Sequence, residues 1–194
     1  MTNPDCALAV FVYEVGYLKS VPRTGWAVGG VQGRLESVAE HSFRTGHLAH
    51  VIALAEGGNA DRAAVLGLYH DVPETRTGDI PHLGRRYLTA AEAEGIIKDQ
   101  TVDLPEIVAG PIRDAVVEFE AQQTAEARYA READKLECLA QARQYQIGGA
   151  QDIDTWIESS VKALQGASPT AQLLAEQLQA TPPGTWWRNA QNGV

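Results

Sequence analysis

The sequence predicts an all-α protein, a compact helical bundle formed by a single domain. Apolar residues recur at spacings of three and four over most of the 194 residues, which is the periodicity of an amphipathic helix. No segment shows the alternation of apolar and polar residues that is typical of a β-strand. Glycine, proline and helix-capping residues separate the periodic segments from one another. The chain is long enough to bury a sizeable core without disulfides or structural metals.

The first half of the chain contains three predicted helices. The first covers about 4–20, where Leu8, Phe11, Val12, Val15 and Leu18 lie on one face. A proline and four glycines make 21–35 a loop. The second helix covers about 37–56 and ends at a pair of glycines, and Asn59 caps the third, which ends at Thr77-Gly78 after Arg76. Pro73 lacks a backbone N–H, so we expect a kink or an early end there.

The second half of the chain is also predicted to be helical. A short helical piece at 81–87 comes first. Five longer helices follow, at about 89–100, 105–118, 122–146, 153–164 and 170–180. The last segment, PPGTWWRNAQNGV, is predicted to be irregular, with Trp186 and Trp187 packed on the body of the protein or on a second subunit.

Composition and charge exclude several classes of protein. Apolar residues make up 44% and charged residues 21% of the chain, as in ordinary water-soluble domains. No apolar run approaches the ~20 residues that cross a bilayer, and the start of the chain lacks a basic region followed by an apolar stretch, so we expect a cytoplasmic protein. Cys6 and Cys138 are far apart without CxxC spacing, which argues against a disulfide framework or a thiolate zinc site.

The distribution of charge favours a small anionic ligand over a nucleic-acid polymer. The net charge of −9 is unsuited to a phosphate backbone, which requires a broad basic surface. Between Lys19 and Arg86, however, eight basic residues face seven acidic ones, so that segment is close to neutral. Arginine outnumbers lysine twelve to four in the whole chain, which suits recognition of a single phosphate group.

Four residues form a candidate metal site. His41 is followed 29 residues later by the pair His70-Asp71, and an isolated aspartate, Asp134, lies much further on. Two neutral imidazoles and two carboxylates are a complete ligand set for one divalent transition metal such as Mn²⁺, Co²⁺, Fe²⁺ or Zn²⁺. Asp134 shares a helix face with alanines and Cys138, and a carboxylate on an apolar face is costly unless it is paired or coordinated.

The order of these residues resembles the HD-domain metal-dependent phosphohydrolases. The motif HDVPETRTGDIP at 70–81 is the most specific part, and the match runs from about Leu18 to Leu139. The sequence is most similar to the 5′-deoxynucleotidase-like branch, which includes the family of HD-domain-containing protein 2. The resemblance implies one HD domain over 1–194, with a core at 4–165 and a C-terminal helix and tail at 166–194, a metal site between helices, and a homodimer.

The resemblance also implies a role for residues outside the metal site. Glu74 would position or activate the attacking water, and Asp79 would bind substrate or protonate the leaving 5′-oxygen, or the two roles would be exchanged. Arg23 would hold the phosphate, Trp26 would pack on the sugar, and His82 would face the pocket. From the residues alone, each of the five could instead be an ordinary surface, turn or packing residue.

The predicted activity is the metal-dependent release of phosphate from (deoxy)nucleoside 5′-monophosphates, with the metal as Lewis acid. Action on another small phosphate ester or nucleotide, or nucleotide binding without turnover, remain alternatives. A dinuclear HD oxygenase would need further histidines between Asp71 and Asp134, where only His82 occurs. Because the loop that holds Trp26 is rich in glycine, we expect only a modest preference for deoxyribose.

Overall fold

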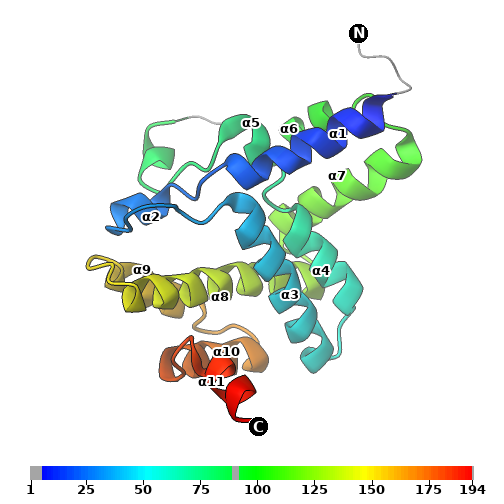
Figure 1. The fold of residues 1–194 in the computed structure, drawn as a ribbon. Coiled ribbons are helices and arrows are strands. Elements are labelled where there is room, and N and C mark those ends of the chain that lie inside the picture. The colour runs from blue at the N-terminus through cyan, green and yellow to red at the C-terminus, as the bar shows by residue number, and fades with distance from the viewer. Residues whose placement is uncertain (1–5, 89–91, 194) are drawn as a thin grey trace.

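The computed structural model describes residues 6–88 and 92–193 (Figure 1). Within these residues the chain forms helices and turns without a strand, apart from one isolated β-bridge between Pro22 and Ser37. The predicted all-α class is therefore confirmed. The helices are α1 Ala7–Gly16, α2 Gly25–Val28, α3 Val38–Glu56, α4 Ala60–Tyr69, α5 Glu74–Thr77, α6 Ala93–Gln100, α7 Glu106–Ala121, α8 Ala125–Ile147, α9 Asp154–Ala163, α10 Pro169–Ala180 and α11 Thr185–Asn192.

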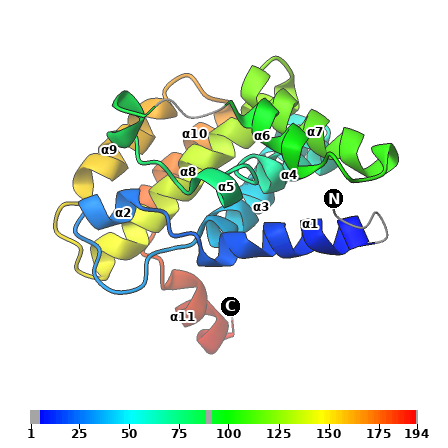
Figure 2. The same ribbon diagram turned by 90° about the horizontal axis from the view of Figure 1, so that it is seen from above.

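Three helices form the centre of the bundle. α3 packs along both α4 and α8, and α4 also contacts α8 (Figure 1). Their shared core is rich in fully buried small residues, which allow helix backbones to approach closely. These include Ala49, Ala53, Ala63, Ala127, Ala130 and Ala133. α9 and α10 pack on the other sides of α8 (Figure 2), whereas α1, α6 and α7 enclose a second apolar cluster around Phe11, Ile97 and Val116.

α3 and α4 approach each other closely at two glycines, Gly46 and Gly67. A Cβ atom on Gly67 would lie 3.0 Å from both Cα and N of Gly46. The neighbouring atoms are backbone, so they cannot move aside as a side chain would. This contact sets the separation of the two helices that carry His41 and lead to His70.

Gly67→Ala should therefore destabilise the protein, although alanine favours a helix more than glycine does. Overpacking costs about 1–3 kcal/mol, against a propensity gain of about 1 kcal/mol. Chemical denaturation of the metal-free protein measures the difference in unfolding free energy. Gly95→Ala in α6 is the matched control, because its Cβ meets nothing within 4 Å, and this variant should be slightly stabilised. An equal increase in unfolding free energy for both variants would show that α3 and α4 can move apart freely.

Several predicted boundaries were wrong. The helix expected over 59–76 ends at Tyr69, and a turn separates it from α5, because Pro73 cannot continue the backbone ladder. The Tyr69 carbonyl accepts a hydrogen bond from Val72 N at 3.1 Å. The loop at 21–35 contains the short helix α2.

The C-terminal segment also differs from its prediction. It forms α11, which projects from the body in the view of Figure 2. Trp186 and Trp187 pack edge to face on each other and stay 70% and 54% exposed. No described helix combines the length and the apolar character needed to cross a bilayer.

Candidate metal centre

His41 is presented by the first turn of α3. Ser37 caps this helix: its hydroxyl accepts a hydrogen bond from Glu40 N, while the Glu40 carboxylate accepts one from Ser37 N. This capping box fixes the start of the helix and thus the direction of the His41 side chain. The imidazole is completely buried, with its Nε2 atom facing the end of α4.

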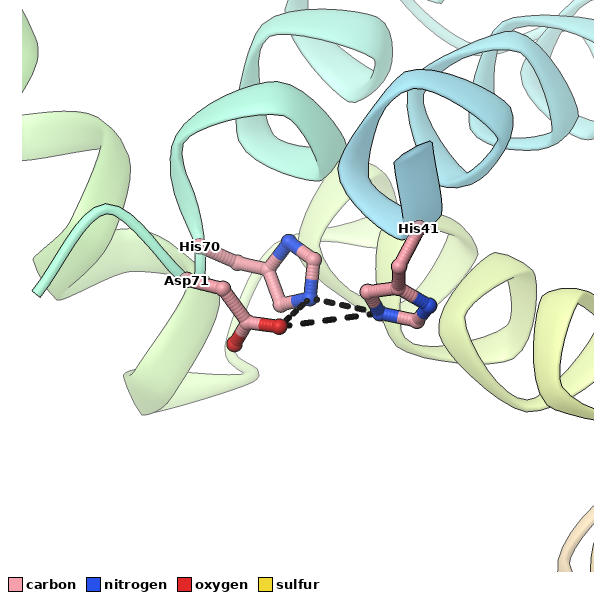
Figure 3. Close-up of side chains that lie close together, drawn as sticks. All are labelled: His41, His70 and Asp71. Atoms are coloured by element: carbon pink, nitrogen blue, oxygen red, sulfur yellow. Dashed lines mark hydrogen bonds and ion pairs between the residues drawn. The ribbon is translucent and has the colours of Figure 1, made fainter. Parts of the chain in front are cut away.

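His70 and Asp71 lie in the turn after α4 rather than in a continuous helix. Figure 3 shows the His70 ring and the Asp71 carboxylate turned toward His41 from this turn. The Asp71 Oδ2 atom is 3.0 Å from His70 Nε2 and 3.6 Å from His41 Nε2. The two Nε2 atoms are 3.3 Å apart. Three ligand atoms from two parts of the chain thus converge on one point.

Asp134 completes the group from α8. Its Oδ1 atom lies 3.3 Å from His41 Nε2, and its Oδ2 atom lies 2.9 Å from Lys135 Nζ. Separations of about 3 Å between neighbouring ligand atoms are those expected around a metal with bond lengths of about 2.0–2.2 Å. The structure thus places Asp134 next to His41, while His41, His70 and Asp71 form the tighter cluster.

The hydrogen bonds of the two histidines also suit a metal. The Nδ1–H of His70 donates to the Gly67 carbonyl at 2.8 Å, and the Nδ1–H of His41 donates to Glu137 Oε2 at 2.5 Å. A neutral imidazole carries one N–H proton, which is on Nδ1 in both rings. Each Nε2 atom then has no proton and offers a free lone pair. Two lone pairs 3.3 Å apart cannot hydrogen-bond to each other, and a shared cation satisfies both.

The electrostatics of the site likewise call for positive charge. Burial and the nearby Arg23 disfavour a charged His41, yet Glu137 and Asp134 raise the pKa of this histidine to about 10. Burial also disfavours ionised carboxylates, but the two histidines keep the pKa values of Asp71 and Asp134 below their usual range. A divalent cation supplies this positive charge and leaves the imidazoles neutral, as ligands must be.

The profile of the HD-domain family matches residues 15–172, which include all four residues predicted to bind a metal. The chain belongs to the HD-domain family. It is 36% identical over 143 residues to the human protein named 5′-deoxynucleotidase HDDC2, an alignment that covers 72% of this chain and 69% of the human one. It is 32% identical over 160 residues to 5′-deoxynucleotidase hdd1 of Schizosaccharomyces pombe, which covers 77% and 80% of the two chains.

A solved structure shares the same HD-domain fold. This is a predicted metal-dependent phosphohydrolase from Magnetospirillum magnetotacticum, with a TM-score of 0.68 and 23% identity. The match covers 91% of each chain. At this level of identity the likeness concerns the arrangement of helices.

Arg23 lies at the edge of the HD-domain metal centre. Its Nη1 atom is 3.3 Å from Asp71 Oδ2, and its Nη2 atom is 3.3 Å from the Cys138 sulfur. Although burial opposes the charge, Cys138 and Asp71 hold the pKa of the guanidinium well above its usual value. The side chain remains 17% exposed, so a permanent cation borders the centre where an anion could approach.

Glu74 and Asp79 lie beside the same centre, but their carboxyl groups differ in their hydrogen bonding. Glu74 Oε2 is buried and has no hydrogen-bond partner among the described residues. Burial and the carboxylates of Asp71 and Asp79 raise the pKa of Glu74 to about 9. Asp79 Oδ2 instead accepts hydrogen bonds from Thr24 N at 2.6 Å and from its hydroxyl at 3.0 Å. Of the two carboxyl groups, that of Glu74 is therefore the one more readily protonated.

Trp26 and His82 occupy positions that differ from those expected of substrate-binding residues. Trp26 is only 2% exposed, and its indole N–H donates to Glu36 Oε2 at 3.0 Å. Its ring packs against Tyr145 and Trp156 in the core. His82 is exposed in the segment that follows Asp79. For both residues, contact with substrate stays a prediction.

The structure adds residues that the sequence analysis did not single out. Glu137 is fully buried and contacts His41, and Arg44 in turn contacts Glu137. Lys135 contacts the outer oxygen of Asp134. Glu137 lies three residues after Asp134 on α8, on the face predicted to be apolar, and that spacing was the available sign of its position.

Proposed function

We propose that this protein is a metal-dependent 5′-deoxynucleotidase that releases phosphate from nucleoside 5′-monophosphates. The supporting observation is the convergence of two bare imidazole nitrogens and two carboxylates next to the unpartnered carboxyl of Glu74. The names of the human and yeast relatives support the substrate class. Binding without turnover would have no use for a carboxyl held ready for a proton beside the ligand set.

In this proposal His41, His70, Asp71 and Asp134 hold one divalent transition metal: Mn²⁺, Co²⁺, Fe²⁺ or Zn²⁺. The bound metal would supply positive charge for the phosphate and the attacking water. Hydrolysis of phosphate monoesters is among the slowest uncatalysed reactions, so charge neutralisation and positioning carry most of the catalysis.

The roles of the surrounding residues follow from their contacts. Arg23 would turn its guanidinium from Asp71 to the phosphate, for which a planar donor fork is well suited. Glu74 would position the attacking water or, in exchange with Asp79, protonate the leaving 5′-oxygen, since its Oε2 atom is not engaged by any described residue. Asp79, held by Thr24, would bind the substrate or protonate the leaving 5′-oxygen.

Trp26 would influence the choice of sugar through the loop that it anchors. One contact in an apolar pocket is worth about 1–3 kcal/mol, or roughly 10–200-fold in discrimination. We expect a deoxyribose preference near the lower end of this range and little choice among bases. We further propose a homodimer, for which light scattering at micromolar concentration should give twice the chain mass of 20.9 kDa.

A substrate panel tests the proposed function. The protein is treated with a chelator, reloaded separately with Mn²⁺, Co²⁺, Zn²⁺ or Mg²⁺, and assayed for phosphate release from ribo- and deoxynucleoside monophosphates. We expect activity that depends on one of the transition metals, with dAMP hydrolysed faster than AMP. If no nucleoside monophosphate is hydrolysed with any metal while other phosphate esters are, the substrate class is wrong.

A further inference from the structure

The buried carboxylate of Glu137 contacts His41 and Arg44, and it also shares a side-chain hydrogen bond with Glu36. Its Oε2 atom is 2.5 Å from His41 Nδ1, on the side of the imidazole away from the metal-ligand atoms. Its Oε1 atom accepts hydrogen bonds from Arg44 Nε at 2.9 Å and Nη2 at 2.6 Å. Each carboxylate oxygen therefore has its own partner, since Oε1 faces the arginine and Oε2 faces the histidine.

Arg44 holds Glu137 in this orientation, because its permanently charged guanidinium donates two hydrogen bonds to Oε1 and leaves Oε2 for the histidine. The guanidinium is itself positioned by Gln141 and by Gln144 Oε1, at 3.0 Å from Nη1. An ionised carboxylate only accepts hydrogen bonds, so Oε2 requires a proton on His41 Nδ1.

We infer that Glu137, oriented by Arg44, is a positioning residue that selects the Nδ1–H tautomer of His41 and so keeps Nε2 available as a metal ligand. The inference rests on the metal site of the proposed function and on no property of the substrate. A partner on the remote nitrogen of a ligating histidine fixes both the tautomer and the ring orientation, and its loss typically costs 10–100-fold in metal affinity, as an order of magnitude.

Glu137→Gln is a sharp test because the amide has one acceptor and one donor end. Arg44 only donates, so it should keep the glutamine oxygen at the position of Oε1. The amide NH₂ then faces His41 Nδ1, which must become an acceptor and release its proton to Nε2. The substitution preserves size and most contacts, yet it should place a proton on the atom that binds the metal.

The first measurement is Zn²⁺ affinity by competition with a chromophoric chelator. We expect Glu137→Gln to bind Zn²⁺ about 10–100-fold more weakly than the unmodified protein. The matched control is Glu118→Gln, because Arg62 contacts Glu118 with the same two atoms at the same distances, 2.9 and 2.6 Å, away from the metal centre. This control should bind Zn²⁺ normally, and equal affinities for all three proteins would overturn the inference.

A second variant separates tautomer selection from a general packing defect. In Arg44→Met/Glu137→Gln no guanidinium fixes the amide, so the glutamine can rotate and offer its oxygen to His41. The double variant should therefore bind Zn²⁺ more tightly than Glu137→Gln, although it carries one more substitution. The Zn²⁺ affinity of Arg44→Met alone should be closer to that of the unmodified protein than the affinity of Glu137→Gln is. A double variant that is weaker than Glu137→Gln would refute the tautomer mechanism.

The tautomer can also be observed directly, even if a variant fails to fold. Nitrogen-15 NMR of the unmodified protein with Zn²⁺ bound should show the His41 proton on Nδ1 and a metal-bound Nε2. A proton on Nε2 would overturn the inference. None of these measurements uses a nucleotide, so failure of the substrate proposal would appear only in the phosphate-release panel.

Discussion

Asp134→Ala is expected to abolish tight binding of the metal and, with it, metal-dependent phosphate release. Asp134 is the only predicted ligand from α8, and its Oδ1 atom faces His41 Nε2 at 3.3 Å. Its removal leaves three ligands, and it also removes a negative charge that offsets the cation. The measurements are the metal content after dialysis and the rate on dAMP from the same preparation.

The stability of the Asp134→Ala protein gives an independent check. A ligand that binds only the folded state raises the melting temperature in proportion to the logarithm of its concentration. Added Mn²⁺ or Co²⁺ should therefore stabilise the unmodified protein and leave the variant unchanged. Asp114→Ala, which alters an exposed aspartate on α7, should behave like the unmodified protein. Full metal content and a normal rate in Asp134→Ala would remove Asp134 from the ligand set.

Glu74→Gln should retain the metal and lose turnover on the order of 10²-fold or more, which is typical for a group that exchanges a proton in the reaction. Glutamine keeps the size and polarity of the side chain but cannot take up a proton. The Oε2 atom of the half-buried Glu74 is buried and unpartnered among the described residues, so such an exchange breaks no existing hydrogen bond there.

A comparison at the same metal occupancy decides this prediction. The rate and the bound metal are measured together for the unmodified protein, for Glu74→Gln and for Glu118→Gln, which removes a partly buried carboxylate elsewhere in the bundle. Loss of metal in Glu74→Gln would make it a ligand rather than a proton acceptor. An unchanged rate would leave Glu74 without a role in turnover.

The fold was largely predictable because the helices carry strong apolar periodicity and clear ends. Ser37 and Asn59 begin α3 and α4 as capping residues, and Gly57 ends α3 with a positive φ of 76°. α11 was missed because it has no apolar stripe that packs on the body, and its two tryptophans remain exposed.

The candidate site was predictable only in part. His41, His70, Asp71 and Asp134 could be chosen by their order in the chain; the first three form one cluster and Asp134 lies next to His41. Glu137 could not be chosen in this way, because its role depends on contacts with His41 and Arg44, which lie more than 90 positions away in the sequence. A single buried carboxylate next to a predicted ligand resembles an ordinary helix-surface residue until its partners are known.

The turn between α4 and α5 has a consequence for how the site is assembled. Consecutive side chains on a helix diverge by about 100°, yet the side chains of His70 and Asp71, at the end of α4, reach toward the same point. His70 Nε2 and Asp71 Oδ2 lie 3.0 Å from each other, so half of the proposed ligand set would be a chelate made by neighbouring residues. Bringing His70 and Asp71 together costs almost no loop entropy, because they are adjacent in the chain. His41 and Asp134, in contrast, reach this pair only when α3 and α8 pack against α4. A metal held by His41, His70, Asp71 and Asp134 would therefore link the end of α4 to both α3 and α8.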